Sequence, residues 1–209
     1  MKNKNLTAPA SKRRAGRPRT FEREDALDIA MDLFWRHGFD GTSTNQLTSA
    51  MGISPPSLYA AFGSKEALYR QAVAQYQKRY GGFFSEPIGA DSSARDAVER
   101  VLLGAAKQFS HPSHAPGCMV ACGELHTSAD NAFLIAEMAG LRQNAQRAIR
   151  ARLETARKSG ELPTATDTGT LAAFYAMVIQ GMAVQARDGA SPAGLKRMAL
   201  LAMQAWPHE

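Results

Sequence analysis

The chain has few cysteines and no long apolar run. Cys118 and Cys122 are the only two cysteines in 209 residues, and a disulfide framework would not place its only pair four residues apart in one predicted helix. No apolar run of about 18 residues occurs, so we expect no membrane span. The basic N-terminus has no apolar segment behind it, so we do not expect a secretory signal. These absences favour the reducing cytoplasm.

The patterns that catalysis needs are also missing. The sequence has no phosphate-binding glycine loop, no Ser/His/Asp order, no paired carboxylates and no His-rich metal-ligand spacing. We therefore expect neither an enzyme nor a bound metal or cofactor. The composition, 44% hydrophobic and 21% charged, is that of a globular protein with a sizeable core.

Positive charge is concentrated at the start of the chain. Residues 1–20 hold seven bases and no acid, whereas the other 189 residues carry 18 bases and 19 acids. Such an arm suits a polyanion, because each contact with a phosphate releases condensed counterions. The alternative is a solvated leader that only aids solubility, and the composition of the arm does not decide between the two.

Apolar residues recur at helical spacing along the rest of the chain, and no segment alternates with the period of a strand. We therefore predict an all-α protein. Thr20 is a candidate N-cap for the first helix, which ends at His37-Gly38. The other helices are expected near 44–51, 55–62, 65–80, 94–109, 118–127, 131–158, 167–187 and 192–206. Residues 83–92, rich in Gly, Pro and Ser, are interpreted as the joint between two modules, 21–82 and 83–209.

Residues 42–69 predict two short helices joined by a tight glycine turn. This is the helix-turn-helix arrangement, in which the second helix enters the major groove of DNA. Thr44 is expected to cap the first short helix and Ser54 the second, while Gly52 permits the turn. Ala50 is small enough for a close helix crossing. The apolar residues expected to hold the unit to the first helix are Leu47, Ile53, Leu58 and Phe62.

The segment from Phe21 to Tyr76 resembles the DNA-binding domain of the TetR/AcrR family of repressors. Its most specific part is LYAAFGSKEALY, which follows a first helix ending LFWRHGFDGTST. The resemblance implies a homodimeric regulator, most often a repressor, that binds a palindromic operator in double-stranded DNA and is released by a small-molecule effector. It implies phosphate contacts at Thr44, Asn45 and Lys65. The recognition face that it implies, after the cap Ser54, consists of Pro55, Pro56, Ser57, Tyr59, Ala60 and Ala61.

One departure concerns how bases are read. Ala60 and Ala61 are small and apolar, so we expect few hydrogen bonds from this helix to base edges. Specificity would then come from thymine-methyl contacts, DNA shape and the arm. The arm contains AGRPR, which is similar to the core of an AT-hook, and Arg17 and Arg19 could follow a narrow A·T minor groove. Beside a helix-turn-helix, this favours a DNA-binding role for the arm.

The last two predicted helices have more apolar circumference than one core contact requires. In the family these helices pair with their copies as a four-helix interface, although an ordinary core helix is the alternative. The predicted dimer-interface residues are Val178, Gly181, Met182, Leu195, Met198, Ala202 and Trp206.

We expect Cys118 and Cys122 to share one helical face near a helix N-terminus, which would lower the pKa of a thiol. One hypothesis is a sensor of electrophiles or oxidants at Cys118. A second is a soft-metal site with His111, His114, Met119 or His126. The third, which free cysteines most often satisfy, is that both are small buried hydrophobic residues.

An effector is expected to enter the C-terminal bundle between helices. The candidate effector-binding residues are Cys118, Met119, Cys122, Phe133, Met138, Phe174, Tyr175, Met177 and Gln180, although Met and aromatic residues on helices more often form core. An architectural DNA-binding protein without an effector is the competing hypothesis. Residues 83–209 argue against it, because the arm and the helix-turn-helix would suffice for that task.

Overall fold

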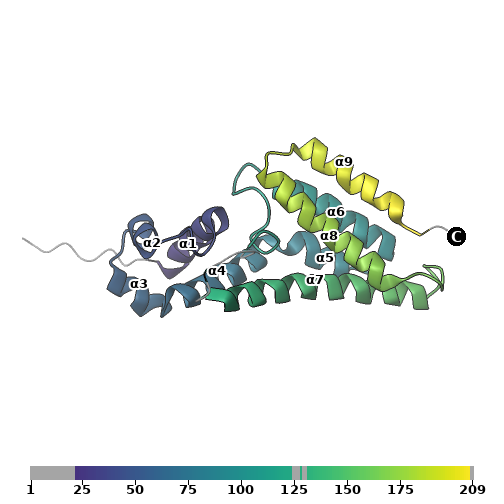
Figure 1. Cartoon of the computed structure of the whole chain (residues 1–209). Coiled ribbons are helices and arrows are strands. Elements are labelled where there is room, and N and C mark those ends of the chain that lie inside the picture. The colour runs from purple at the N-terminus through teal and green to yellow at the C-terminus, as the bar shows by residue number, and fades with distance from the viewer. Residues whose placement is uncertain (1–21, 124–127, 129–130, 208–209) are drawn as a thin grey trace, which may run out of the picture.

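The computed structural model describes residues 22–123, 128 and 131–207, and every regular element within them is helical, which confirms the all-α class. The helices are α1 (Arg23–His37), α2 (Thr44–Met51), α3 (Pro55–Phe62), α4 (Lys65–Tyr80), α5 (Gly82–Gly89), α6 (Ala94–Phe109), α7 (Ala132–Lys158), α8 (Thr168–Arg187), α9 (Pro192–Ala202) and the short 3-10 helix η2 (Met203–Ala205). α1–α3 and the start of α4 form a head at one end of the molecule. α5–α9 form a bundle at the other end, with the long α7 along its base (Figure 1).

Side chains that precede the helices fix where several of them begin. α2 has a full capping box, in which the Gln46 amide N–H donates to Ser43 Oγ (3.2 Å) and Gln46 Oε1 accepts from the Ser43 N–H (2.7 Å). The predicted cap Thr44 is therefore wrong by one residue, and Thr44 is the first helical residue. Ser54 caps α3, as predicted. The predicted cap Thr20 of α1 is also wrong, because Glu22 holds the N-cap position and makes no side-chain cap hydrogen bond; Thr20 itself lies outside the described residues.

Aromatic and aliphatic side chains of α1–α4 fill the head. The ring of Phe34 meets that of Tyr69 edge-on, with 5.1 Å between their centroids. The predicted anchors Leu47, Leu58 and Phe62 are buried, and Ile53 packs half-buried against them. Gly52 has φ = 67°, a conformation that glycine adopts without strain, as the predicted turn requires.

The prediction that Ala50 lies at a close helix crossing is wrong, because Ala50 is exposed. α2 packs on α1 through the side on which Leu47 and Thr48 are buried.

The predicted joint at residues 83–92 contains a helix, α5, which packs on α6. Gly104 of α6 makes this approach possible, since a Cβ added there would lie 3.1 Å from Cβ of Phe83. The Gly, Ser and Pro residues of this segment misled the prediction. Pro87 comes late in α5 and is buried.

The predicted helix at 118–127 is also wrong over residues 118–123, which form turns; residues 124–127 lie outside the described part. Gly117 has φ = 81° and packs against α8, where an added Cβ would lie 2.7 Å from the Ala183 carbonyl oxygen. Its N–H donates to the Phe109 carbonyl (2.8 Å). These contacts hold the 111–123 loop (residues 111–123) across the bundle.

α8 is long and apolar enough to cross a membrane by length and composition. Its hydropathy has another explanation, because Leu171, Tyr175, Ala176 and Ala183 are buried inside the bundle. The predicted final helix, 192–206, is observed as α9 followed by η2.

Candidate DNA-binding and effector sites

α3 has one anchored face and one exposed face. Leu58 is fully buried and Phe62 is 4% exposed, whereas Tyr59 between them is 46% exposed. This confirms the predicted direction of Tyr59. The other exposed residues of the predicted recognition face are Ser54, Pro55, Pro56, Ser57 and Ala60, with Ala61 half-buried. The exposed face thus carries one large polar side chain among small ones.

The N-terminus of α2 lies beside this face. The Tyr59 hydroxyl is 3.5 Å from Thr44 Oγ1, a distance at the limit of a hydrogen bond, and Asn45 next to Thr44 is exposed. The first amide groups of a helix carry partial positive charge and bind anions. Thr44, Asn45 and Tyr59 therefore surround a surface suited to a DNA phosphate.

Lys65 is the first residue of α4, and Ser64 caps this helix by accepting from the Ala67 N–H (3.1 Å). Lys65 Nζ lies 4.1 Å from the centroid of the Phe39 ring. A cation is disfavoured at the positive end of a helix dipole. The Phe39 ring therefore holds this ammonium group close to the positive end of α4.

The head alone is not basic. Residues 22–82 contain six bases and seven acids, so the excess positive charge of the N-terminal half belongs to the arm. The predicted minor-groove residues Arg17 and Arg19 lie outside the described residues.

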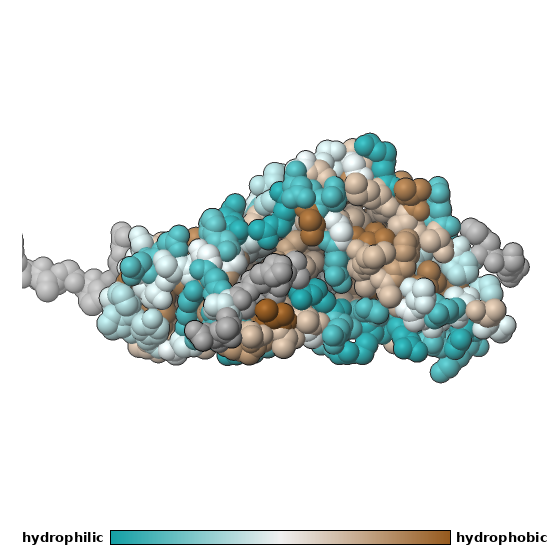
Figure 2. All heavy atoms as spheres, viewed as in Figure 1, coloured by the Kyte–Doolittle hydropathy of each residue, from teal (hydrophilic) through white to brown (hydrophobic). Residues whose placement is uncertain are grey.

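α8 and α9 present an apolar face on the bundle, visible as a hydrophobic patch in Figure 2. A groove between the two helices is lined by residues that include Phe174, Val178, Gly181 and Met198. The large apolar side chains most exposed on these helices are Met177 (63%), Val184 (42%), Met198 (40%), Leu200 (44%) and Leu201 (64%).

The predicted dimer interface is corrected in part. Gly181 and Met198 are exposed and Val178 is half-buried, as an interface requires. Leu195 (0%), Met182 (2%), Trp206 (5%) and Ala202 (7%) are instead buried within one chain and support this face from below. A charge at Met182 would therefore disturb the core of the chain before it disturbed a dimer.

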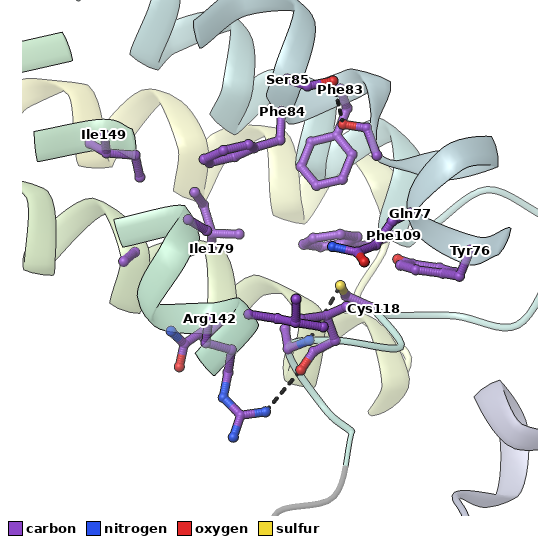
Figure 3. Close-up of a pocket in the computed structure, with 17 residues that line it drawn as sticks. Tyr76, Gln77, Phe83, Phe84, Ser85, Phe109, Cys118, Arg142, Ile149 and Ile179 are labelled. Carbon is purple, nitrogen blue, oxygen red and sulfur yellow. Dashed lines mark hydrogen bonds between the residues drawn. The ribbon is translucent and has the colours of Figure 1, made fainter. Parts of the chain in front are cut away.

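The bundle contains a cavity of about 260 Å³, bounded by α4–α8 and the 111–123 loop (Figure 3). Its wall is mostly apolar and includes the rings of Phe83, Phe84 and Phe109. Its polar lining residues are Tyr76, Gln77, Ser85, Arg142 and Gln180.

Of the predicted effector residues, Cys118 and Gln180 line this cavity. Met119 and Cys122 line a second cavity, between the loop and the head. The other five do not line the first cavity and are wrong for it: Met138 and Tyr175 are core, Phe174 lines the groove between α8 and α9, and Phe133 and Met177 are exposed.

Sequence reasoning missed Phe83, Phe84 and Arg142. Two adjacent phenylalanines indicate a buried segment, but Phe83 and Phe84 lie in residues 83–92, which the sequence pattern predicts to be a joint.

Burial raises the pKa of the Cys118 thiol, although its Sγ accepts from the Ala121 N–H at 3.4 Å. The predicted lowering of this pKa is wrong, because residues 118–123 do not form the helix on which it depended. Among the described residues, no group of three His, Cys, Asp or Glu side chains could hold a metal ion. His126 lies outside the described residues.

Ion pairs and hydrogen bonds tie the head to α7. Arg70 of α4 donates to both carboxylate oxygens of Glu137 at 2.8–3.1 Å. Asp40, after α1, accepts from the Asn131 side chain at 2.9 Å. Both pairs are at the surface and contribute little stability.

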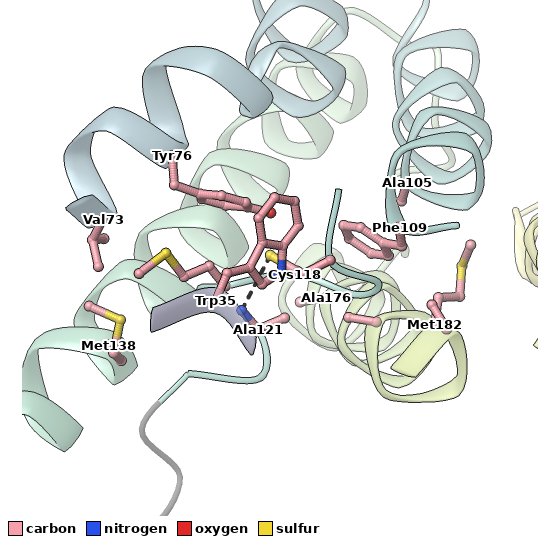
Figure 4. Packing of buried hydrophobic residues seen from close by; sticks show 14 of the residues in the cluster. Trp35, Val73, Tyr76, Ala105, Phe109, Cys118, Ala121, Met138, Ala176 and Met182 are labelled. Carbon is pink, nitrogen blue, oxygen red and sulfur yellow. Dashed lines mark hydrogen bonds between the residues drawn. The ribbon is translucent and has the colours of Figure 1, made fainter. Parts of the chain in front are cut away.

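A continuous core also joins the head to the 111–123 loop. Trp35 of α1 stacks on His114 of the loop, with 4.6 Å between ring centroids. Figure 4 shows Trp35 and Tyr76 packed beside Cys118, with Phe109 of the bundle on the other side. A shift of the loop would therefore reach both the cavity and the head.

The arrangement defines a helix-turn-helix regulator with a separate helical domain, and the comparisons with known proteins agree. The family described as bacterial regulatory proteins, tetR family, matches residues 26–72. The repressor ComR of Escherichia coli K12 is 32% identical over 197 residues, which cover 94% of each chain. The chain therefore belongs to the TetR family of transcriptional regulators, whose members are not enzymes.

Two further proteins are similar to this chain. The repressor BdcR of Escherichia coli K12 is 38% identical over 105 residues, about half of each chain. A cysteine mutant of the TetR family regulator CifR, solved with 26-bp double-strand operator DNA, has a TM-score of 0.87 and 38% identity. That match covers 92% of this chain and 100% of the CifR chain.

Proposed function

We propose that this chain is a cytoplasmic transcriptional repressor, which binds an inverted-repeat operator as a homodimer and leaves it when a small molecule enters the bundle. The exposed face of α3 carries the proposal: Tyr59 projects outward while Leu58 and Phe62 fix the helix from below. ComR and BdcR, which are named repressors, and CifR, which was solved on operator DNA, support the same function.

In this function α3 enters the major groove, and the N-termini of α2 and α4 face the phosphates on either side. Thr44 and Asn45 contact one phosphate, with Tyr59 beside them, and Lys65 contacts another. Because Ala60 offers only a methyl group, base reading depends on thymine-methyl contacts and on DNA shape.

The basic arm supplies the charge that the head lacks. Residues 22–82 are nearly neutral, so the long-range attraction to DNA comes from the seven bases of residues 1–20. Arg17 and Arg19, beside Pro18, fit a narrow A·T minor groove next to the half-site.

The apolar face of α8 and α9 forms the dimer interface. A two-fold interface places the same patch of each chain against its copy. Met177, Val184 and Leu201 are its accessible apolar side chains, and Gly181 lets the partner helix approach. Linking two heads makes the second DNA contact intramolecular, which raises affinity by about 10²–10⁴-fold.

Release follows from differential binding of the effector to two states of the chain. The cavity lies beside the 111–123 loop, and that loop contacts the head through Trp35 and His114. An effector that changes the loop thereby changes the spacing of the two α3 helices.

A gel shift with DNA from upstream of the chain's own gene tests the proposal. Lys65→Ala is expected to weaken binding strongly, and Lys107→Ala, which removes an exposed lysine on α6, is the matched control and is expected to leave it unchanged. Circular dichroism checks that helix content is retained. Equal DNA affinity of the two variants would contradict the assignment of the DNA-binding face.

A further inference from the structure

The cavity in the bundle has a mostly apolar wall, and one of its few polar lining residues is Arg142. Among the described residues that line it, Arg142 is the one charged side chain, and none is acidic. The rings of Phe83, Phe84 and Phe109 surround the space, and Arg142 is placed at its edge (Figure 3). One cationic group in a wall that is otherwise mostly aromatic and aliphatic matches a ligand with an anionic group and an apolar body.

Among the residues that the structure describes, the hydrogen bonds of Arg142 are to neutral carbonyl groups. Its Nη1 donates to the carbonyl oxygens of Val120 (2.9 Å) and Gly123 (3.0 Å), both in the 111–123 loop. Burial lowers the pKa of Arg142 from its ordinary value, yet an arginine remains charged at neutral pH. Carboxylates form shorter and stronger hydrogen bonds with a guanidinium than neutral carbonyls do. A carboxylate in the cavity would therefore compete with the loop for Arg142.

We infer that the effector is a small aromatic or otherwise apolar carboxylic acid, whose carboxylate binds Arg142 and draws it away from Val120 and Gly123. This inference rests on the proposed function and names the ligand class of the same cavity. The volume of about 260 Å³ lies just below the usual range for ligand pockets. It fits one ring with a short acidic side chain.

The loop carries the effect to the head. Met119 and Cys122 of the loop line the second cavity together with Phe34 and Tyr69 of the head. A Cβ at Gly123 would lie 3.5 Å from the Tyr69 hydroxyl, so the loop backbone is close to the head at this residue. When Arg142 no longer holds the carbonyls of Val120 and Gly123, this contact changes and the head is freed to rotate.

Calorimetric titration of the full-length protein tests the ligand class. The probes are phenylacetate and 4-methylbenzoate, each paired with its neutral amide, which has nearly the same shape. We expect each acid to bind at least about 10-fold more tightly than its amide, a difference of about 1.4 kcal/mol. The acids, and not the amides, should weaken binding of operator DNA in a parallel gel shift.

Variants of Arg142 test the residue. Arg142→Gln is expected to lose the preference for acid over amide, and Arg142→Lys to keep it at reduced strength, because lysine retains the charge but not the planar donor geometry. Arg147→Gln, at an exposed arginine one turn further along α7, is the matched control and should keep the preference. Arg142→Gln without ligand should also bind operator about 5-fold or more weakly, as a loss of coupling implies.

Three results would overturn the inference. The first is equal binding of acid and amide, and the second is a preference for the acid that survives in Arg142→Gln. The third is no binding of either acid at about 10 mM, a concentration ten times the dissociation constant that corresponds to about 4 kcal/mol of binding free energy. These failures are distinct from failure of the proposed function. A protein that binds operator but shows no acid preference refutes the ligand class alone, whereas a protein that binds no operator refutes the repressor.

Discussion

A charge at Leu201 is predicted to split the dimer without unfolding the chain. Leu201 is 64% exposed on α9, so its side chain contributes little to the core of one chain. Burying a fully exposed leucine contributes about 2 kcal/mol, so covering this fraction contributes about 1.3 kcal/mol per chain and about 2.6 kcal/mol per dimer. Leu201→Lys loses this contribution and adds the cost of desolvating two ammonium groups. The dimer should therefore dissociate at least about 80-fold more readily.

Sedimentation velocity beside a gel shift measures both consequences. Leu201→Lys is expected to sediment as a monomer with wild-type helix content and to lose operator affinity, although its DNA-contacting residues are unchanged. Ala151→Lys, on the exposed side of α7, is the control and should remain a dimer. A Leu201→Lys protein that remains dimeric at the same concentrations would place the interface away from α8 and α9.

Four further results are expected. Removing residues 1–19 should leave helix content unchanged and flatten the salt dependence of operator binding by up to about 6 in log–log slope per chain, because seven bases are lost; an unchanged slope excludes the arm from DNA. Tyr59→Ala should weaken operator binding with helix content retained, and a loss of helix by circular dichroism would mean that Tyr59 is core. Gly117→Ala should lower the unfolding free energy by about 2 kcal/mol, since its positive φ is strained and Ala183 blocks a Cβ, whereas Gly189→Ala, with positive φ but open space, should cost less in the same urea titration. Burial raises the pKa of Tyr175 from 10.0 to about 12. The free energy of unfolding should therefore fall as the pH rises from 10 to 12, because the unfolded chain loses the tyrosine proton at a lower pH than the folded chain does. Tyr175→Phe should remove that part of the pH dependence of unfolding.

The head could be predicted from sequence because its structure is set locally. Serine caps, the Gly52 turn and the spacing of Leu47, Leu58 and Phe62 each fix a short stretch of backbone, and α2 and α3 begin and end where the pattern indicated. The error at the cap of α2, Thr44 in place of Ser43, arose because two adjacent residues are both good caps.

The cavity could not be predicted in the same way, because it depends on contacts between distant segments. The sequence pattern predicts a helix starting at Cys118, but the packing of Gly117 against α8 is a contact between distant segments that the pattern does not contain. Phe83 and Phe84 stood among helix-breaking residues, yet Gly104, some twenty residues further on, provides the surface on which α5 packs. Helical periodicity also did not distinguish the exposed Leu201 from the buried Leu195, since both are apolar positions of one helix.

Footprinting of the full-length protein on DNA that it selects from a random library tests the central claim most directly. The account predicts an inverted repeat, with half-site centres about one turn of DNA apart, ~34–36 Å. It also predicts that Tyr59→Ala weakens the footprint at the same protein concentration. Selection of no common sequence, or of a single half-site protected by a monomer, would contradict a dimeric operator-binding repressor.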